Sequence, residues 1–333
     1  MLKENCFIVK LDISENTVGA IGAGAISSML EINYTLKTLI LRSTHLKDSD
    51  AQLLSSALKN NSTLLELDLC HNDLGDLAGM YLASGLAENN SLAKLNLSWN
   101  AIRGKGSVAL FNALKANSIL EILDLSWNGI SLPGCQALGR ALKVNTTLRI
   151  LDMSNNHITP EAAKKLVIGL KKNIGLEAFL VGMNPLGEEG IMTLLVPLYK
   201  HSTLRIFSLQ GLTVSTGIQA KIEDLMDIKD LYILHSGVGG YRRQRISCST
   251  ISMVEQFINE NQLHALDGFT QRDLDRTGYI SFGDVLEVLY ELGLKISEEQ
   301  VKKIQTHVML QRRSKVNYRQ VKDYIFSPLS DAV

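Results

Sequence analysis

A hydrophobic pattern with a period of 28 residues runs from residue 8 to about residue 230. In the copy from 148 to 173, apolar residues take the first, fourth and sixth positions, and Asn156 and Ile158 take the ninth and eleventh. The first positions of successive copies are spaced by 28 without an insertion: Ile8, Leu36, Leu64, Leu92, Leu120, Leu148, Leu176 and Leu204. Self-similarity at a fixed period of this length indicates a solenoid of stacked units.

Each unit is expected to contain a short strand followed by a helix. The alternation predicts a strand in which Leu151 and Met153 point inward while Ile150 and Asp152 point outward. Leucines at helical spacing follow, as in the pair Leu166 and Leu170. One such unit cannot bury its apolar face alone, so each must stack on the next. Because helices are wider than strands, we expect a curved array with a parallel sheet on its concave side.

Two columns of polar residues accompany the pattern. The ninth position holds Asn16, Thr44, Asn72, Asn100, Asn128, Asn156, Asn184 and Leu212. The twenty-sixth position holds Asn33, Asn61, Asn89, Asn117, Asn145 and Asn173. We expect the ninth-position amide to be buried and to bond the backbone that turns out of the strand. At the twenty-sixth position asparagine is expected to end the helix in a left-handed conformation.

The spacing L-x-x-L-x-L-x-x-N-x-L followed by a full helix resembles the ribonuclease-inhibitor type of leucine-rich repeat, which includes the GTPase activator of Ran and the repeat domains of NOD-like receptors. The resemblance implies an α/β fold, a horseshoe solenoid of about eight repeats over residues 8–236. Its last repeat loses the asparagine, and residues 231–237 are expected to form a final edge strand. Only seven residues precede Ile8, which suggests a shortened isoform.

A different signal follows the repeats. The glycine-rich and basic stretch 237–250 predicts a linker, and residues 251–327 predict a small all-α domain. The segment 273–284, DLDRTGYISFGD, resembles the calcium loop of an EF-hand, with Gly278 at the sharp bend. The resemblance implies these metal ligands, with Tyr279 acting through its carbonyl: Asp273, Asp275, Thr277, Tyr279 and Asp284. Asp284 stands where glutamate usually gives two oxygens, so we expect either one weak calcium site or a loop that keeps only the fold.

EF-hands come in pairs, and a second loop follows. Aligning Val316 with Ile280 places no carboxylate at its ligand positions, which are Met309, Gln311, Arg313, Lys315 and Gln320. This loop is expected to bind no metal and to support the first through a short strand contact. The combination of repeats with a degenerate EF-hand pair resembles the leucine-rich repeat-containing protein 74 family.

Composition narrows the class of partner. Lys and Arg number 34, as do Asp and Glu, so the whole chain offers no bulk attraction for nucleic acid or membrane. It has no run of 18 apolar residues and no signal-peptide core at its N-terminus. We therefore expect a cytoplasmic protein that binds neither nucleic acid nor membrane.

The outward strand positions form columns on the expected concave face. The fifth position is mostly acidic and the eighth holds the two tryptophans, which gives these candidate partner-binding residues: Asp68, His71, Asn96, Trp99, Asp124, Trp127 and Asp152. Neighbouring strands lie about 4.8 Å apart, so Trp99 and Trp127 should stack beside the acidic row. Exposed tryptophan is typical of protein-binding hot spots, and carboxylates favour a basic partner. Alternatively, the indoles pack over the turn and the aspartates bond neighbouring backbone.

Catalysis finds little support in the sequence. The seven histidines are scattered over different repeat positions, and the chain has no Walker loop or dinucleotide fingerprint. We therefore expect a non-enzymatic protein-interaction scaffold. The alternative, by resemblance, is a GTPase-activating protein of the Ran-activator type, although no matching motif can be mapped.

Overall fold

The computed structural model describes residues 3–229, 231–239, 241–242, 268–273, 279–297, 301 and 315–317. The chain divides into two compact units, Met1–Arg242 and Arg243–Val333. The first contains the repeats. Most of the expected linker 237–250 and much of the expected EF-hand pair lie outside the described residues. No described helix is long and apolar enough to cross a membrane.

The first unit is built around one parallel sheet whose nine strands follow the order of the chain, β1 to β9. The strands are β1 (Lys10–Asp12), β2 (Thr38–Ile40), β3 (Glu66–Asp68), β4 (Lys94–Asn96), β5 (Ile122–Asp124), β6 (Ile150–Asp152), β7 (Ala178–Leu180), β8 (Ile206–Leu209) and β9 (Tyr232–His235). From β1 to β8, each residue pairs with the one 28 positions later, as Leu123 does with Leu151. The repeat period therefore fixes the register.

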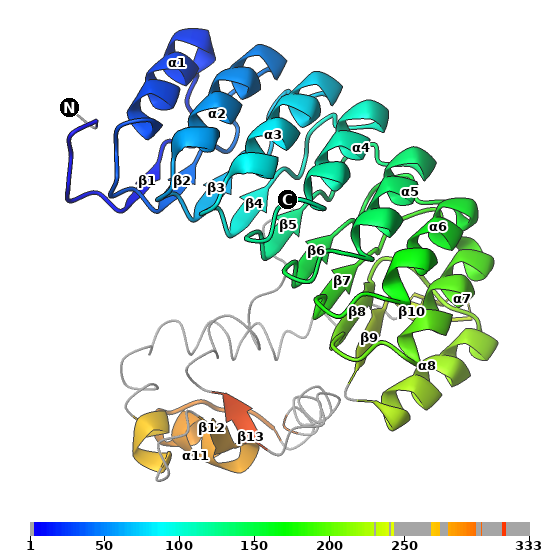
Figure 1. Cartoon of the computed structure of the whole chain (residues 1–333). Coiled ribbons are helices and arrows are strands. Elements are labelled where there is room, and N and C mark those ends of the chain that lie inside the picture. Colours follow the sequence, from blue (N-terminus) through cyan, green and yellow to red (C-terminus); the bar gives the residue numbers. More distant parts are fainter. Residues whose placement is uncertain are drawn as a thin grey trace. The chain divides into compact units, whose positions relative to one another are not determined.

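A helix follows each of the first eight strands, and the helices lie on one side of the sheet (Figure 1). They are α1 (Gly19–Leu30), α2 (Asp48–Asn60), α3 (Asp76–Glu88), α4 (Gly104–Ala113), α5 (Leu132–Ala141), α6 (Pro160–Leu170), α7 (Gly187–Leu198) and α8 (Thr216–Ile228). The predicted final strand is present as β9, and a hairpin of β10 (Gly237–Val238) and β11 (Tyr241–Arg242) follows it. This arrangement of alternating strands and helices is the predicted solenoid.

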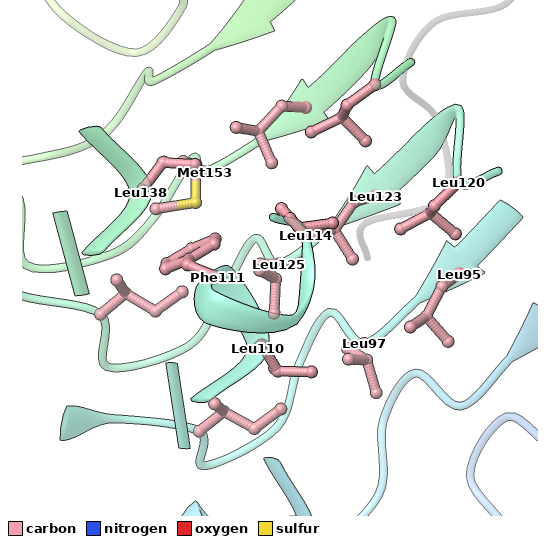
Figure 2. Close-up of a cluster of buried hydrophobic side chains, with 14 of the residues drawn as sticks. Leu95, Leu97, Leu110, Phe111, Leu114, Leu120, Leu123, Leu125, Leu138 and Met153 are labelled. Carbon is pink, nitrogen blue, oxygen red and sulfur yellow. The ribbon is translucent and has the colours of Figure 1, made fainter. Parts of the chain in front are cut away.

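The core lies between the sheet and the helices. Leu151 and Met153 are fully buried, as the alternation predicts. Figure 2 shows Leu97 and Leu125, which directly follow β4 and β5, close to Leu110 and Phe111 of α4. Because each unit contributes the same few leucines, the core is continuous along the array.

Four of the ninth-position asparagines are buried, as expected: Asn72, Asn128, Asn156 and Asn184. Asn100 is half-buried and Asn16 is exposed. Asn156 donates through Nδ2 to the carbonyl oxygens of Leu125 at 2.9 Å and of Met153 and Ser154 at 3.1 Å. Its Oδ1 accepts the N–H of Ile130 at 2.9 Å. One side chain thus satisfies turn groups in two adjacent repeats.

The left-handed helix stop expected at the twenty-sixth position is wrong. Asn61 (φ −79°, ψ 125°) and Asn89 (φ −70°, ψ 136°) have extended backbones. The extended conformation lets the Asn61 side chain bridge repeats: Nδ2 donates to the Leu30 carbonyl at 2.7 Å, and Oδ1 accepts the N–H of Leu64 at 2.8 Å. The helix end is therefore capped by a side chain of the next repeat.

In the second unit, β12 (Tyr279–Ser281) pairs antiparallel with β13 (Lys315–Asn317), and α11 (Phe282–Glu291) follows β12. Ile280 lies opposite Val316, the register in which the two loops align in the sequence. Ser281 begins α11 with a capping box, in which Asp284 Oδ2 accepts the Ser281 N–H at 3.0 Å and the hydroxyl at 2.6 Å.

Candidate protein-binding face

The sheet face that points away from the helices, which we call the concave face, carries the third and fifth positions of each repeat. The eighth position lies beyond the strand, in a turn with a left-handed backbone. The residues with φ between 50° and 83° at this position are Glu15, Ser43, His71, Trp99, Trp127, Asn155, Met183 and Gly211. The strand alternation does not predict this conformation, because it counts the column among the outward strand positions. At Asn155 and Gly211 the residue type is compatible with positive φ, but at the two tryptophans it is not.

Hydrogen bonds between repeats hold the left-handed turns. The N–H of Trp99 donates to the carbonyl of Ser126, and that of Trp127 to the carbonyl of Ser154, both at 3.0 Å. A bulky residue with positive φ is uncommon and costs about 1 kcal/mol or more. These backbone hydrogen bonds therefore hold both tryptophans in the left-handed conformation.

Three aromatic rings form a continuous stack along this column. The His71 and Trp99 ring centroids lie 4.6 Å apart with an interplanar angle of 13°. Those of Trp99 and Trp127 lie 3.9 Å apart at 12°. The expected stacking of the tryptophans is thus present, and His71 extends it. Trp127 remains 37% exposed, so the stack presents apolar ring surface to solvent.

The fifth-position side chains form a second column next to the stack. Asp68, Asn96, Asp124 and Asp152 each accept, through Oδ1, the N–H of the residue two positions later, at 2.7 to 3.0 Å. The aspartates therefore bond neighbouring backbone, as the alternative expects.

The acidic column is poorly hydrated in its middle. Burial raises the pKa of Asp124, and burial together with the neighbouring Asp124 carboxylate raises the pKa of Asp152 to about 7. Asp68 instead lies 3.6 Å from the guanidinium of Arg42. A cation bound beside Asp124 and Asp152 would relieve the unfavourable burial of their charge.

The seven predicted partner-binding residues thus lie together on four consecutive repeats, from β3 to β6 (Figure 1). The predicted metal ligands are only partly described. Asp273 is 5% exposed and Asp284 caps α11, whereas Asp275 and Thr277, and the side chain of Tyr279, lie outside the described residues. Within the described ranges, no three His, Cys, Asp or Glu side chains are grouped as metal ligands would be.

Five segments of the chain match the family described as Leucine Rich repeat: residues 4–27, 60–83, 88–111, 116–139 and 144–167. These five segments are leucine-rich repeats. The chain is also similar to a solved structure of actin-binding site 2 of leiomodin-1, with 23% sequence identity, a TM-score of 0.32, and coverage of 47% of this chain and 75% of that one. No curated protein matches the chain.

Proposed function

We propose that this leucine-rich repeat protein is a non-enzymatic scaffold that binds a protein partner through its concave face. The observation that carries the proposal is the ring stack of His71, Trp99 and Trp127. The three residues lie in turns with positive φ that hydrogen bonds between repeats hold, and the stack is partly exposed. Rigid aromatic side chains lose little conformational entropy on binding, and tryptophan is enriched among hot-spot residues. The stack therefore supplies a pre-organised contact surface.

The charge beside the stack favours a basic partner. Asp124 and Asp152 follow one another in the fifth-position column, and both are half-buried. Carboxylates in such surroundings attract cationic groups more strongly than fully hydrated ones do. A lysine or arginine of the partner is therefore expected to sit next to the indoles.

Removing both indoles is expected to weaken capture of the partner at least about tenfold, because the apolar anchor is lost. The measurement is affinity capture from lysate, comparing the full chain with the Trp99→Ala, Trp127→Ala double variant. A matched control replaces Phe7 and Tyr34, which are 85% and 69% exposed outside the stack, with alanine. The proposal fails if both double variants lose the same proteins or neither loses any.

Accelerated GTP hydrolysis by a panel of small GTPases would instead favour the Ran-activator alternative.

We also propose that the second unit holds one weak calcium site and that the chain is related to the leucine-rich repeat-containing protein 74 family. The pairing of β12 with β13, with Ile280 opposite Val316, supports a paired-loop arrangement. Asp273 and Asp284 are carboxylates at the two ends of the proposed loop, and hard oxygen ligands suit calcium. Asp284 Oδ2 also accepts two hydrogen bonds from Ser281, so fewer of its lone pairs are free for a cation.

Calorimetric titration of the full chain with calcium is expected to show one site with a dissociation constant in the sub-millimolar to millimolar range. Asp273→Ala should abolish these heats because it removes the first carboxylate of the loop. Asp227→Ala, in the repeat unit, is the control and should leave them unchanged. Flat heats for the unaltered chain would contradict the proposal.

A further inference from the structure

The concave face changes character along the array. Over β1 to β4 the third position is polar, with Lys10, Thr38, Glu66 and Lys94. From β5 to β8 it is apolar, with Ile122, Ile150, Ala178 and Ile206, and the fifth position is apolar at Leu180 and Leu234, with the buried Ser208 between them on β8. The acidic pair Asp124 and Asp152 lies where the two halves meet, on β5 and β6.

Two apolar side chains of this second half are exposed to solvent, while Leu180 and the isoleucines of β5, β6 and β8 are half-buried. Leu234 on β9 is 47% exposed, and Met183 in the eighth-position column is 52% exposed. We call Ile122, Ile150, Leu180, Met183, Ile206 and Leu234 the apolar strip. Apolar side chains that follow one another along a surface mark interaction sites more often than isolated ones do. The strip begins on β5, in the same repeat as Trp127, with Asp124 between Ile122 and the tryptophan along the chain.

We propose that the segment bound by the concave face is an amphipathic helix that lies along the array, with a basic residue at Asp124 and Asp152 and its apolar side over the apolar strip toward β9. This inference rests on the proposed function, because it assigns the partner of the same site.

The spacing of the repeats favours a helix over an extended peptide. Neighbouring strands lie about 4.8 Å apart. Side chains on one face of a helix recur every three or four residues, which is a rise of about 4.5 to 6 Å. Same-face side chains of an extended chain recur at about 6.7 Å. A helix can therefore place one apolar side chain against each successive repeat, whereas an extended chain falls out of register.

The length and direction of the segment follow from the same geometry. From β5 to β9 the strip spans about 19 Å, which about 13 helical residues cover. The carboxylates are confined to the β5 and β6 end of the strip. A basic residue is therefore expected at one end of the segment and apolar residues over its next three turns, the pattern of helix recognition in an apolar groove.

Selection from a display library of random peptides of about 16 residues on the full chain tests the inference. Peptides that also bind the Trp99→Ala, Trp127→Ala variant are discarded. The proposal predicts enriched sequences with a lysine or arginine at one end and, next to it, apolar residues at spacings of three and four. Stack-dependent peptides with a spacing of two, or without a basic residue, would overturn the helix inference and leave the proposed function standing. Recovery of no stack-dependent peptide also overturns it, and capture of a folded partner then decides the proposed function separately.

The strip itself is tested with Leu234→Gln, which removes an exposed apolar side chain without adding charge. It should weaken the enriched peptide about tenfold. Leu77→Gln on α3, at a leucine that is 54% exposed outside the sheet, is the matched control and should not change affinity. Equal affinities for all three proteins would show that the strip takes no part in binding.

Discussion

Replacing Asn156 with alanine is expected to lower the free energy of unfolding by about 4 kcal/mol. The buried Asn156 side chain makes four hydrogen bonds across two repeats. Alanine leaves the N–H of Ile130 without this acceptor and away from water. The carbonyls of Leu125, Met153 and Ser154 each lose one donor and keep another. The expected loss is that of four hydrogen bonds at about 1 kcal/mol each, including one buried donor left unsatisfied.

Chemical denaturation followed by circular dichroism measures this change. Asn16→Ala is the control in the same column, because Asn16 is exposed and bonds only the Ile13 and Ser14 carbonyls of its own repeat. We expect that variant to lose less than about 1 kcal/mol. If Asn16→Ala and Asn156→Ala lower the free energy of unfolding equally, the buried ninth-position asparagines do not stabilise the array as inferred.

Asp152→Asn is expected to raise the free energy of unfolding by about 2 kcal/mol at pH 8 and to change it little at pH 4. The pKa of Asp152 is raised from 3.8 to about 7 in the folded protein. Between these values the folded state holds more protons than the unfolded state, so stability falls as pH rises from about 4 to 7. Asparagine removes this loss and keeps an oxygen for the Ser154 N–H. The expected rise in the free energy of unfolding is roughly half of what the full pKa shift of Asp152 would give, because the carboxylate is partly exposed to solvent.

The fifth-position column also provides the matched control. Asn96 already accepts the Ser98 N–H at 3.0 Å in the equivalent position, so Asn96→Asp should reverse the effect and destabilise the protein at pH 8. Denaturation curves of both variants between pH 4 and pH 8 give the measurement. A stability difference for Asp152→Asn that does not vary with pH would show that its carboxylate is not the group that titrates.

The parts of the fold set by periodic burial could be predicted from the sequence. The spacing of 28 residues predicts that Leu123 lies opposite Leu151. Because Trp99 and Trp127 are also 28 residues apart, it predicts that they are neighbours. Stacking follows from register alone, because in-register parallel strands bring identical positions within about 4.8 Å. The acidic column could be found in the same way.

The features that depend on backbone conformation and solvation could not be predicted. The left-handed turn at Trp127 follows from inter-repeat bonds that residue types do not reveal, since tryptophan disfavours positive φ. The extended backbone at Asn61 follows from a carbonyl partner in the preceding repeat. The raised pKa of Asp152 depends on how far neighbouring side chains exclude water.

Tryptophan fluorescence tests the central claim directly, because Trp99 and Trp127 are the chain's two tryptophans and both belong to the ring stack. Titration with a captured partner or an enriched peptide that lacks tryptophan should shift or quench the emission, with the same midpoint as an independent binding measurement. The midpoint should move to higher concentration as salt is added, because carboxylates attract the basic group. Saturable binding that leaves the emission unchanged would contradict the claim that the partner docks on the stack.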